Sequence, residues 1–516
     1  PSDFAGLTPT AQRNPSGVPG LQIDGYFPDT SKTNTTRGWN HDAQFVIRLP
    51  DKWNGKLVIT GAPGVRKQYA PDPVIGDWVI AKGYAYASTD KGNTGNSFYT
   101  DGAQPGDAIA EWHRRVTELT VATKEAVRLK YGRAPDRTYV TGISNGGYLT
   151  RWQLENRPEL YDGGVDWEGT LMLANGPNLF TYLPVALRNY PRYRSTGDKA
   201  AHDAMIAAGF APGSEFLWED HYGVYWDLTQ RVYREELDPE YDGPITGGVP
   251  FCQPGTPNCD ADYDFNTRGE PVRSAIRKAE NTGRIGKPMI TLHGTLDALL
   301  PIGTDSDVYK RMILGAGRGD LHRYYVVENG NHVDGRYDVY PDRIRPMWPC
   351  WTTALSALEA WVERGTAPPP DQFVPDERKP GVDVANSCAI PRGSSVAGAG
   401  PFTSTRQVRR KTPRAVVVRV RPRRDRRRPY RFRITGRLVL PVGMKATQVC
   451  GSGRVVVNIG SVRRTPRLSG GCTFRTSARF GARPTRGRLT LRVRWMGNRA
   501  LRPRSAARRT LRAGRG

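Results

Sequence analysis

The chain has 516 residues, of which 38% are hydrophobic, and its formal net charge is +26. This length is too great for one ordinary domain, so we expect two or more. No apolar run approaches the ~20 residues of a membrane-spanning helix, which argues against a membrane span. No signal-peptide pattern begins at Pro1, so we expect a mature or trimmed chain.

The first element that bears on function is a β-type run at residues 56–60, which leads into Gly61-Ala62-Pro63-Gly64. A loop after an early strand can supply a backbone N–H to an oxyanion that forms beside a nucleophile. Pro63 has no N–H and is excluded. We therefore expect Ala62 to be this donor, with Gly64 as the alternative.

The segment Gly142-Ile143-Ser144-Asn145-Gly146 lies between a β-type run at 137–141 and a helix-type run. A strand that turns sharply into a helix through G-x-S-x-G exposes the serine hydroxyl at the tip of the turn. Small glycines let the backbone close up there. The pattern predicts that Ser144 is a nucleophile and that the N–H of Asn145 is the second oxyanion donor.

More than a hundred residues separate the helix after Ser144 from the next strand of the expected sheet. A plain connection from that helix to the next strand needs far fewer, so we expect an inserted lid at about residues 176–284. The lid is rich in aromatic residues, and most of them should pack the lid itself. We expect Trp218, Tyr225 and Trp226 to contact an aromatic or hydrophobic acyl group instead.

The lid also carries Asp260, Asp262 and Asp264 at alternate positions. Carboxylates at this spacing can converge on a hard cation such as calcium if the loop curls. The expected chemistry requires no cofactor, so calcium here would be structural. The alternative is an acidic, solvated loop.

Two further strands lead to the partners that a nucleophilic serine needs. The apolar run 288–292 is followed by Asp297, and the run 323–327 is followed by His332. Of the 7 histidines, only His332 comes after both Asp297 and a strand. We predict a triad of Ser144, Asp297 and His332. Asp334 is a competing carboxylate, which we disfavour because residues so close in sequence rarely point at each other's side chains.

A helix-type run at residues 351–362 completes the pattern. Five stretches match one family in the right order: residues 83–92, residues 131–137, the serine turn with Gly147, His293-Gly294 before Asp297, and residues 360–368. Together they resemble the tannase/feruloyl esterase family of α/β-hydrolases over most of residues 40–370. The resemblance implies carboxylic ester hydrolysis by the triad, with a lid before the strand that leads to Asp297.

The chain departs from that family at two positions. The family usually carries cysteines directly before the serine and directly after the histidine, joined by a disulfide, whereas this chain has Ile143 and Val333. Tannin or feruloyl substrates therefore do not carry over. Hydrolases of hydroxybutyrate oligomers are similar in architecture and are an equally good comparison for the substrate.

The six cysteines lie at 252, 259, 350, 388, 450 and 472. Sequence does not decide among the 15 pairings that six cysteines allow. The simplest set is local: Cys252 with Cys259, Cys350 with Cys388, and Cys450 with Cys472. An even count in self-contained segments is typical of a secreted, extracellular protein, whereas buried free thiols are the alternative.

Charge is distributed unevenly along the chain. Residues 401–516 hold 34 of the 76 Arg and Lys residues and 1 of the 50 acidic residues, so the first 400 residues are mildly acidic. Short runs in 405–500 alternate basic and apolar residues, which predicts a small antiparallel sandwich with arginine facing outward. We expect the basic face to bind an anionic cell envelope or polymer surface, or to be a solvated basic surface only. No specific nucleic-acid motif is present.

These patterns predict an α/β class protein: an α/β-hydrolase fold with a large inserted lid, followed by a small all-β, sandwich-like basic domain. The expected parts are a catalytic domain at 1–392, a linker at 393–404, and an Arg-rich domain at 405–516. We expect a secreted serine esterase that acts on an aromatic or hydroxyalkanoate ester. A serine peptidase or other acyl hydrolase, and a non-catalytic surface-binding protein, are the alternatives.

Overall fold

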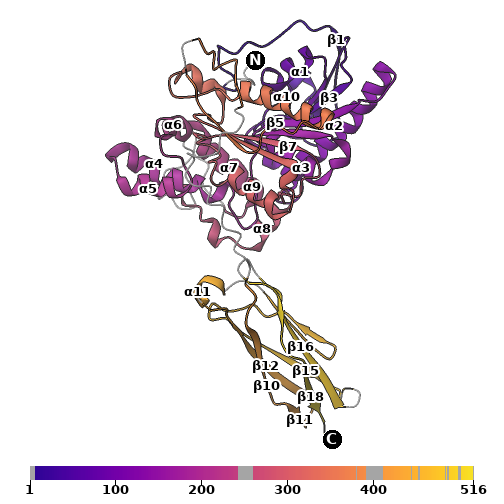
Figure 1. Ribbon diagram of the computed structural model, residues 1–516, viewed down its shortest axis with the longest axis vertical. Helices are drawn as coiled ribbons and strands as arrows, with labels where there is room; N and C mark the ends of the chain where they lie inside the picture. The colour runs from indigo at the N-terminus through magenta and orange to yellow at the C-terminus, as the bar shows by residue number, and fades with distance from the viewer. Residues whose placement is uncertain are drawn as a thin grey trace. The chain divides into compact units, whose positions relative to one another are not determined.

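The structure is a computed structural model that describes residues 6–241, 260–378, 381–390, 411–442, 444–450, 454–482, 484, 487–497 and 501–514. The chain splits into two compact units, Pro1–Gly398 and Ala399–Gly516, which are called the N-terminal unit and the C-terminal unit below (Figure 1). The linker expected at 393–404 lies outside the described residues.

A nine-stranded sheet forms the centre of the N-terminal unit, in the order β1-β2-β4-β3-β5-β6-β7-β8-β9. β1 and β4 each pair antiparallel with β2, and the strands from β4 to β9 run parallel. The strands are β1 Gly20–Tyr26, β2 Gln44–Pro50, β3 Lys56–Gly61, β4 Ala85–Thr89, β5 Arg137–Ile143, β6 Gly163–Trp167, β7 Met289–Gly294, β8 His322–Val327 and β9 Gln372–Val374. This topology confirms the expected α/β-hydrolase fold.

Helices cover both faces of the sheet because its central strands are apolar on both sides. Leu57 and Ile59 of β3 join one hydrophobic core with helices α2 and α3, while Val58 joins a second core with α1 and α10. Ligands of such folds bind where parallel strands end, and the serine turn lies at that edge. The helices on the sheet are α1 Asp77–Ala81, α2 Asp107–Tyr131, α3 Asn145–Asn156, α9 Ser306–Gly315 and α10 Trp348–Arg364.

A helical insertion separates β6 from β7, in the place expected for the lid. Its helices are α4 Leu183–Thr196, α5 Lys199–Ala207, α6 Glu215–Asp220, α7 Trp226–Leu237 and α8 Glu270–Arg277. Aromatic residues of the insertion join the same core as α2 and α3. In Figure 1, α4, α5 and α6 lie to the left of the sheet, and α8 lies below it.

Glu236 connects the insertion to the sheet layer. Its buried carboxyl accepts a hydrogen bond from the backbone N–H of Ala108 at the start of α2, at 3.0 Å. Burial raises the pKa of Glu236 to about 8, although backbone donors around it act in the other direction. The folded chain therefore keeps this proton over a pH range in which the unfolded chain loses it.

Glu236→Gln is expected to gain stability relative to the wild type as the pH rises. The unfolded wild type ionises near the ordinary glutamate pKa, so Glu236 makes folding less favourable between about pH 5 and pH 8, and glutamine has no proton to lose. Melting temperatures of both proteins at pH 5 and pH 8 measure the effect. An equal difference between them at the two pH values would contradict it.

The C-terminal unit consists of two sheets that share one hydrophobic core. One sheet has the order β10-β12-β15, and the other has the order β11-β18-β16-β13-β14 with β17 beside β16. Almost all pairs are antiparallel, and β11 with β18 is the parallel exception. The elements are β10 Ala415–Arg421, β11 Arg424–Asp425, β12 Tyr430–Val439, α11 Ala446–Val449, β13 Val455–Ile459, β14 Val462–Arg464, β15 Thr473–Phe480, β16 Arg488–Trp495, β17 Arg504–Ser505 and β18 Arg509–Ala513. The expected all-β, sandwich-like domain is confirmed.

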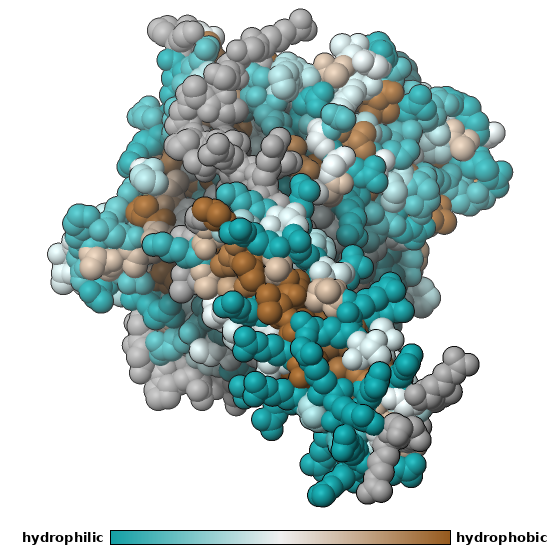
Figure 2. Space-filling model, turned by 60° about the horizontal axis from the view of Figure 1, so that its bottom comes forward, coloured by the Kyte–Doolittle hydropathy of each residue, from teal (hydrophilic) through white to brown (hydrophobic). Residues whose placement is uncertain are grey.

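Each unit contains one disulfide among the described residues. Cys350 of α10 is bonded to Cys388, and Cys450 is bonded to Cys472, as the local pairing predicted. The pair expected between Cys252 and Cys259 lies outside the described residues. Within the described residues, no helix is both long and apolar enough to span a bilayer. Hydrophilic side chains cover most of the face seen in Figure 2, in line with a mean hydropathy of −0.58.

Candidate active site

Ser144 occupies the turn between β5 and α3 in a conformation that L-residues rarely adopt, with φ 59° and ψ −121°. Such strain at a single residue is typical of functional turns. The turn closes only because glycines flank it: a Cβ on Gly142 would lie 2.4 Å from the carbonyl carbon of Gly146, and a Cβ on Gly146 would lie 2.7 Å from the carbonyl oxygen of Gly61. The local sequence therefore holds the Ser144 hydroxyl at the tip of the turn.

The structure brings Ser144, His332 and Asp297 together from three loops at one edge of the sheet. His332 Nε2 lies 3.0 Å from Ser144 Oγ, and His332 Nδ1 lies 2.8 Å from Asp297 Oδ2. Because a carboxylate only accepts hydrogen bonds, the imidazole proton belongs on Nδ1, and Nε2 accepts from the serine hydroxyl. His332 is 4% exposed and Asp297 is 1% exposed, so water competes little for these contacts.

Asp297 has every hydrogen bond that a buried carboxylate needs. Its Oδ1 accepts from the backbone N–H groups of Leu299 and Leu300, each at 2.8 Å, and its Oδ2 lies 3.3 Å from Nε2 of the buried His293. Burial alone would raise the pKa of Asp297. The charge of His332 and the hydrogen bonds from His293 and His332 outweigh burial, and the pKa is lowered. Asp297 is therefore held as the anion.

The competing carboxylate, Asp334, is used elsewhere. It accepts hydrogen bonds from the backbone N–H groups of Met347 and Trp348, at 2.6 and 2.7 Å, where α10 begins. Burial raises the pKa of Asp334 to about 7. Asp334 thus caps a helix and does not contact the imidazole of His332.

Of the two backbone N–H groups expected as oxyanion donors, that of Asn145 is available and that of Ala62 is not. Asn145 is the first residue of α3, where a backbone N–H has no partner inside the helix. The N–H of Ala62, by contrast, donates to the carbonyl oxygen of Thr89 at 2.9 Å, so the choice of Ala62 was wrong. Gly64 and Val65 line the pocket beside Ser144, and within the described residues their N–H groups have no acceptor. Gly64, the alternative donor, fits.

The side chain of Asn145 fixes the two donor loops to each other. Its Nδ2 donates to the carbonyl oxygen of Gly64 at 2.9 Å, and its Oδ1 accepts from Tyr233 Oη at 2.8 Å and from Thr170 Oγ1 at 3.1 Å. Tyr233 belongs to α7 of the insertion. One amide therefore joins the loop that contains Gly64, the serine turn and the insertion.

A cavity of about 340 Å³ opens above Ser144 and His332. Its walls are mostly apolar, and the residues that α7 contributes to them are Leu228, Thr229, Val232 and Tyr233. Ile143 and Val333, which stand where the resembled family has cysteines, also line this cavity and belong to one hydrophobic cluster. Both positions are apolar in this chain, so no disulfide can join them.

Of the three aromatic residues expected to contact substrate, only Tyr225 lines the cavity. Trp218 and Trp226 are fully buried, so the expectation for them was wrong. Trp218 Nε1 donates to Ser214 Oγ at 2.9 Å, and Trp226 Nε1 donates to the carbonyl oxygen of Ala298 at 2.7 Å. Both rings pack the core of the insertion because their helices turn that side inward.

The three aspartates of the expected calcium ladder do not converge. Asp260 is buried and forms ion pairs with Arg231 and Arg234, at 2.7 and 3.0 Å, while Asp262 and Asp264 are exposed. Within the described residues, their oxygens are not among the groups of possible ligand atoms that lie within 4.8 Å of one another. Two guanidinium groups already neutralise Asp260, so the ladder is not arranged as a cation site.

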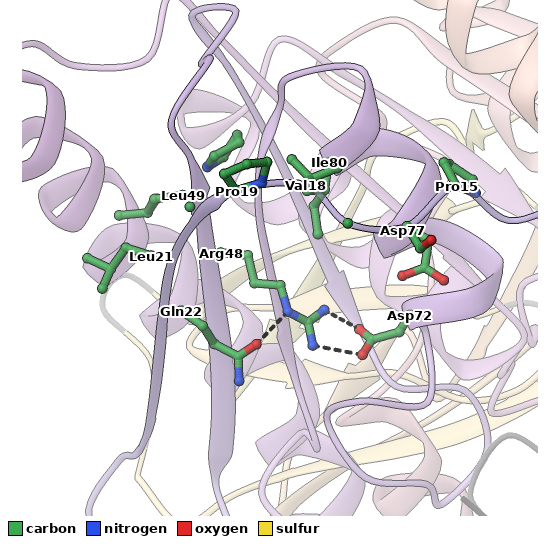
Figure 3. A pocket seen from close by; sticks show the side chains of 14 residues that line it. Pro15, Val18, Pro19, Leu21, Gln22, Arg48, Leu49, Asp72, Asp77 and Ile80 are labelled. Carbon is green, nitrogen blue, oxygen red and sulfur yellow. Dashed lines mark hydrogen bonds and ion pairs between the residues drawn. The ribbon is translucent and has the colours of Figure 1, made fainter.

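A second hollow of about 330 Å³ lies between β1, β2 and the N-terminal segment and shares no lining residue with the cavity at Ser144. Figure 3 shows Arg48 pointing toward Asp72 and Gln22 across this hollow. The guanidinium forms two hydrogen bonds with Asp72, at 2.6 and 2.8 Å. Its charge is paired, and the hollow presents no nucleophile.

Two buried residues near the trio were missed by sequence reasoning. Glu168 follows β6 directly, and its Oε2 lies 3.9 Å from His332 Nδ1. Arg151 of α3 pairs with Asp166 and donates to Ser306 Oγ, and Ser306 Oγ lies 2.7 Å from His293 Nδ1. A charged residue inside an apolar segment was the only available signal for either, because no motif includes them.

Comparison with known proteins adds relatives of named function. Residues 30–168 match the family described as tannase and feruloyl esterase, and residues 260–396 match the family described as 3HB-oligomer hydrolase. The chain is 30% identical over 142 residues to the mono(2-hydroxyethyl) terephthalate hydrolase of Piscinibacter sakaiensis, which is 25% of this chain and 23% of that protein. It is 32% identical over 125 residues to the D-(-)-3-hydroxybutyrate oligomer hydrolase of Cupriavidus metallidurans, 23% of this chain and 17% of that protein.

The matched region spans less than a quarter of the length of either curated relative. Among solved structures, feruloyl esterase B from Aspergillus oryzae aligns with a TM-score of 0.42 and 16% identity, covering 71% of this chain and 86% of that one. The two family matches confirm the resemblance expected from the sequence motifs: the chain is a relative of the tannases and feruloyl esterases over residues 30–168 and of the 3HB-oligomer hydrolases over residues 260–396.

Proposed function

We propose that this chain is a serine carboxylic-ester hydrolase that acts through an acyl-enzyme on Ser144. The observation that carries the proposal is the contact of 3.0 Å between Ser144 Oγ and His332 Nε2, at a strained turn that faces a mostly apolar cavity. The curated relatives carry the names of ester hydrolases, which agrees with this chemistry.

The reaction follows from the positions of the protons. His332 Nε2 takes the Ser144 proton as Oγ bonds to the ester carbonyl carbon, and Asp297 stabilises the imidazolium through Nδ1–H. The N–H groups of Asn145 and Gly64 stabilise the oxyanion. The C–O bond to the leaving alcohol then breaks, and the alcohol leaves with the proton from His332. Water then attacks the acyl-enzyme as His332 takes its proton, the bond to Ser144 Oγ breaks with return of that proton to Oγ, and the carboxylic acid is released.

The proposed substrate is a compact ester with an aromatic or hydroxyalkanoate acyl group. A cavity of about 340 Å³ with apolar walls fits a group of that size better than a folded polymer segment. The two curated relatives are named for a terephthalate monoester and for hydroxybutyrate oligomers, which are esters of these two kinds. The two disulfides support a secreted, extracellular enzyme.

A substrate panel tests the proposal. It contains mono(2-hydroxyethyl) terephthalate, hydroxybutyrate dimer and trimer, methyl ferulate, methyl gallate, p-nitrophenyl acetate and peptide p-nitroanilides. We expect turnover of one or more of the first three esters above the rate for ferulate and gallate. Cleavage of the peptide substrates with all esters inert would overturn the proposal in favour of a peptidase.

Leu228→Trp is expected to narrow the acyl site. Leu228 lines the cavity from α7, and a larger ring there removes space that an aryl acyl group needs. We expect kcat/KM for aryl esters to fall about tenfold or more, and that for p-nitrophenyl acetate to fall much less, because one or two kcal/mol of lost contact has this effect. Leu314→Trp on α9 is the matched control, because Leu314 is 52% exposed and does not line the cavity. Equal losses for both ester sizes would contradict this location of the acyl site.

A further inference from the structure

The C-terminal unit presents one sheet face with repeated, unpaired positive charge. The outward positions of β10, β12 and β15 carry seven arginines, whereas the inward positions carry the core: Arg419, Arg421, Arg431, Arg433, Arg437, Arg475 and Arg479. The register places Arg421 opposite Arg433 and Arg431 opposite Arg479. Like charges directly opposite each other destabilise a sheet, so stability of the fold does not explain this pattern.

Three of these seven guanidinium groups line one groove together with that of Arg467. A groove of about 720 Å³ lies on this face, and Arg419, Arg437 and Arg475 reach it from three adjacent strands, with Arg467 from the segment before β15. Within the described residues, none of these four side chains has a hydrogen-bond or ion-pair partner. The whole segment from 401 to 516 has one acidic residue, Asp425, and this residue does not line the groove.

The groove has the chemistry of a phosphate site. Each guanidinium is a planar fork of donors, and the tetrahedral oxygens of a phosphate accept from several forks that approach from different directions. A planar carboxylate is filled by one bidentate fork. The hydroxyls of Thr435 and Thr473 line the same groove and add neutral donors. Strand neighbours lie about 4.8 Å apart, so charges on this face repeat at spacings that a linear polymer can follow.

Nucleic acid fits this face less well. Bases bind single-strand sites by stacking on aromatic rings. The outward positions of β10, β12 and β15 hold no aromatic residue. Tyr430 and Phe432 point inward, and Phe474, which lines the groove, is only 4% exposed. The face can therefore contact the phosphate backbone of a nucleic acid, but it has no exposed aromatic ring on which a base could stack.

We propose that the groove formed by Arg419, Arg437, Arg467 and Arg475 binds a phosphodiester polymer of the cell surface and anchors the enzyme there. This binding is independent of the proposed ester hydrolysis. The proposal assigns a ligand class and a binding site to the C-terminal unit.

A charge-matched pair of variants of the full chain tests the groove. One variant is Arg419→Gln/Arg437→Gln/Arg475→Gln, and the control is Arg488→Gln/Arg492→Gln/Arg494→Gln, which removes the same charge from exposed positions of β16 in the other sheet. Binding to immobilised synthetic poly(glycerol phosphate) is measured at physiological salt, with polygalacturonate and oligo-dT as competing probes. We expect the groove variant to lose at least tenfold in affinity and the control less than threefold.

Three outcomes overturn the proposal: equal losses in both variants, no binding by the wild type, or tighter binding of oligo-dT or polygalacturonate than of poly(glycerol phosphate). Hydrolysis of a soluble ester is expected to be the same in all three proteins. Failure of the polymer assay with ester hydrolysis intact therefore rejects the groove alone.

A second, independent observation concerns Glu168, which lies beside the Ser144–His332–Asp297 trio. Glu168 is fully buried and has φ 48°, a conformation that costs free energy for a residue with a side chain. Its Oε1 accepts from the N–H of Gly294 at 2.8 Å. Its Oε2 has no hydrogen-bond partner in the described part of the chain and lies 3.9 Å from His332 Nδ1. Buried oxygens without a partner are costly, and this one sits at a reacting group.

The arrangement places two acids around one imidazole. Glu168 follows β6 and Asp297 follows β7, and these strands are parallel neighbours, so both acids lie at the same edge. Burial, followed by the charge of Asp297, raises the pKa of Glu168 well above its ordinary value. Atoms of Glu168, His293 and Asp297 lie close enough for a metal ion. His293 Nε2 instead faces the carbonyl oxygen of Leu300 at 2.9 Å, which requires a proton on that nitrogen.

On the basis of the proposed ester hydrolysis, we infer that Glu168 is a second acid for His332, neutral while Asp297 is charged and able to replace it as the anion at Nδ1. It is a positioning residue, because it acts through His332. When Asp297 is made neutral, the larger of the two charges that oppose ionisation of Glu168 disappears, while burial and the charge of Asp334 remain. Glu168 then gives up its proton to solvent at a lower pH than in the wild type and becomes the carboxylate partner.

Asp297→Asn compared with Asp297→Asn/Glu168→Gln tests this role. Neutralising the acid of such a trio costs about 10⁴-fold in kcat where no second acid exists. We expect a loss of about 10²-fold in the single variant and a further ~10²-fold loss in the double variant. The rate of the single variant should rise with pH as Glu168 ionises, and that of the double variant should not.

Glu168→Gln alone gives a second readout that does not depend on folding of the Asp297 variants. We expect the wild-type pH profile to have an alkaline limb that comes from ionisation of Glu168, and we expect Glu168→Gln to lack this limb. Equal rates for Asp297→Asn and the double variant, or an unchanged alkaline limb in Glu168→Gln, overturn the inference. If Ser144→Ala stays active, the proposed function itself has failed.

Discussion

Ser144→Ala is expected to lower kcat/KM for soluble esters by about 10⁴-fold or more. The variant keeps the cavity, the oxyanion donors and the His332–Asp297 hydrogen bond, but it has no atom that can form the acyl-enzyme. The remaining rate comes from binding and from oxyanion stabilisation, which leave about 10³–10⁴-fold catalysis over water in comparable enzymes. Initial rates on p-nitrophenyl acetate and on the best ester of the panel measure the loss.

The control for this variant is Ser195→Ala, which removes a hydroxyl from an exposed position of α4. It should retain wild-type rates. Alanine has the same Cβ as serine, so Ser144→Ala should melt within a few degrees of the wild type. Turnover of Ser144→Ala within tenfold of the wild type would contradict a nucleophilic role for Ser144.

Arg151→Met is expected to destabilise the N-terminal unit by about 3–5 kcal/mol, since removal of one partner leaves buried charges without compensation. Arg151 is fully buried and pairs with Asp166 at 2.7 Å and with Asp305 at 2.8 Å. Its Nη2 also donates to Ser306 Oγ, the group that contacts His293. Methionine has a similar length, so the loss reports on charge and hydrogen bonding more than on packing.

Urea unfolding followed by tryptophan fluorescence measures this loss, because 11 of the 12 tryptophans precede residue 400. The matched control is Arg128→Met on α2, where an exposed arginine pairs with an exposed Glu125. Such surface pairs contribute little, so the control should leave the unfolding midpoint in place. A midpoint for Arg151→Met equal to that of the control would show that the buried network does not stabilise the unit.

The trio could be predicted because each member follows a strand, and strand order fixes which loops meet. Ser144 had a turn motif, while Asp297 and His332 were identified by their position after apolar runs. The same logic gave the place of the insertion. Local sequence is sufficient here because the carboxyl ends of parallel strands share one edge.

The other residues depend on contacts that sequence does not contain. Ala62 was a poor choice because its N–H is taken by Thr89, a residue at the end of a different strand. Trp218 and Trp226 are aromatic residues of the insertion, but the orientation of their helices decides whether they face the core or the cavity. Glu168 has no motif, and only the pairing of β6 with β7 brings it to His332.

Reaction with a fluorophosphonate followed by peptide mass mapping tests the central claim most directly. The reagent bonds covalently to a serine that an adjacent imidazole activates, whatever the natural ester is. The account predicts one phosphonyl adduct on Ser144 in the wild-type chain, and far slower labelling in His332→Ala. An unlabelled chain, or an adduct on another residue with Ser144 unmodified, would contradict it.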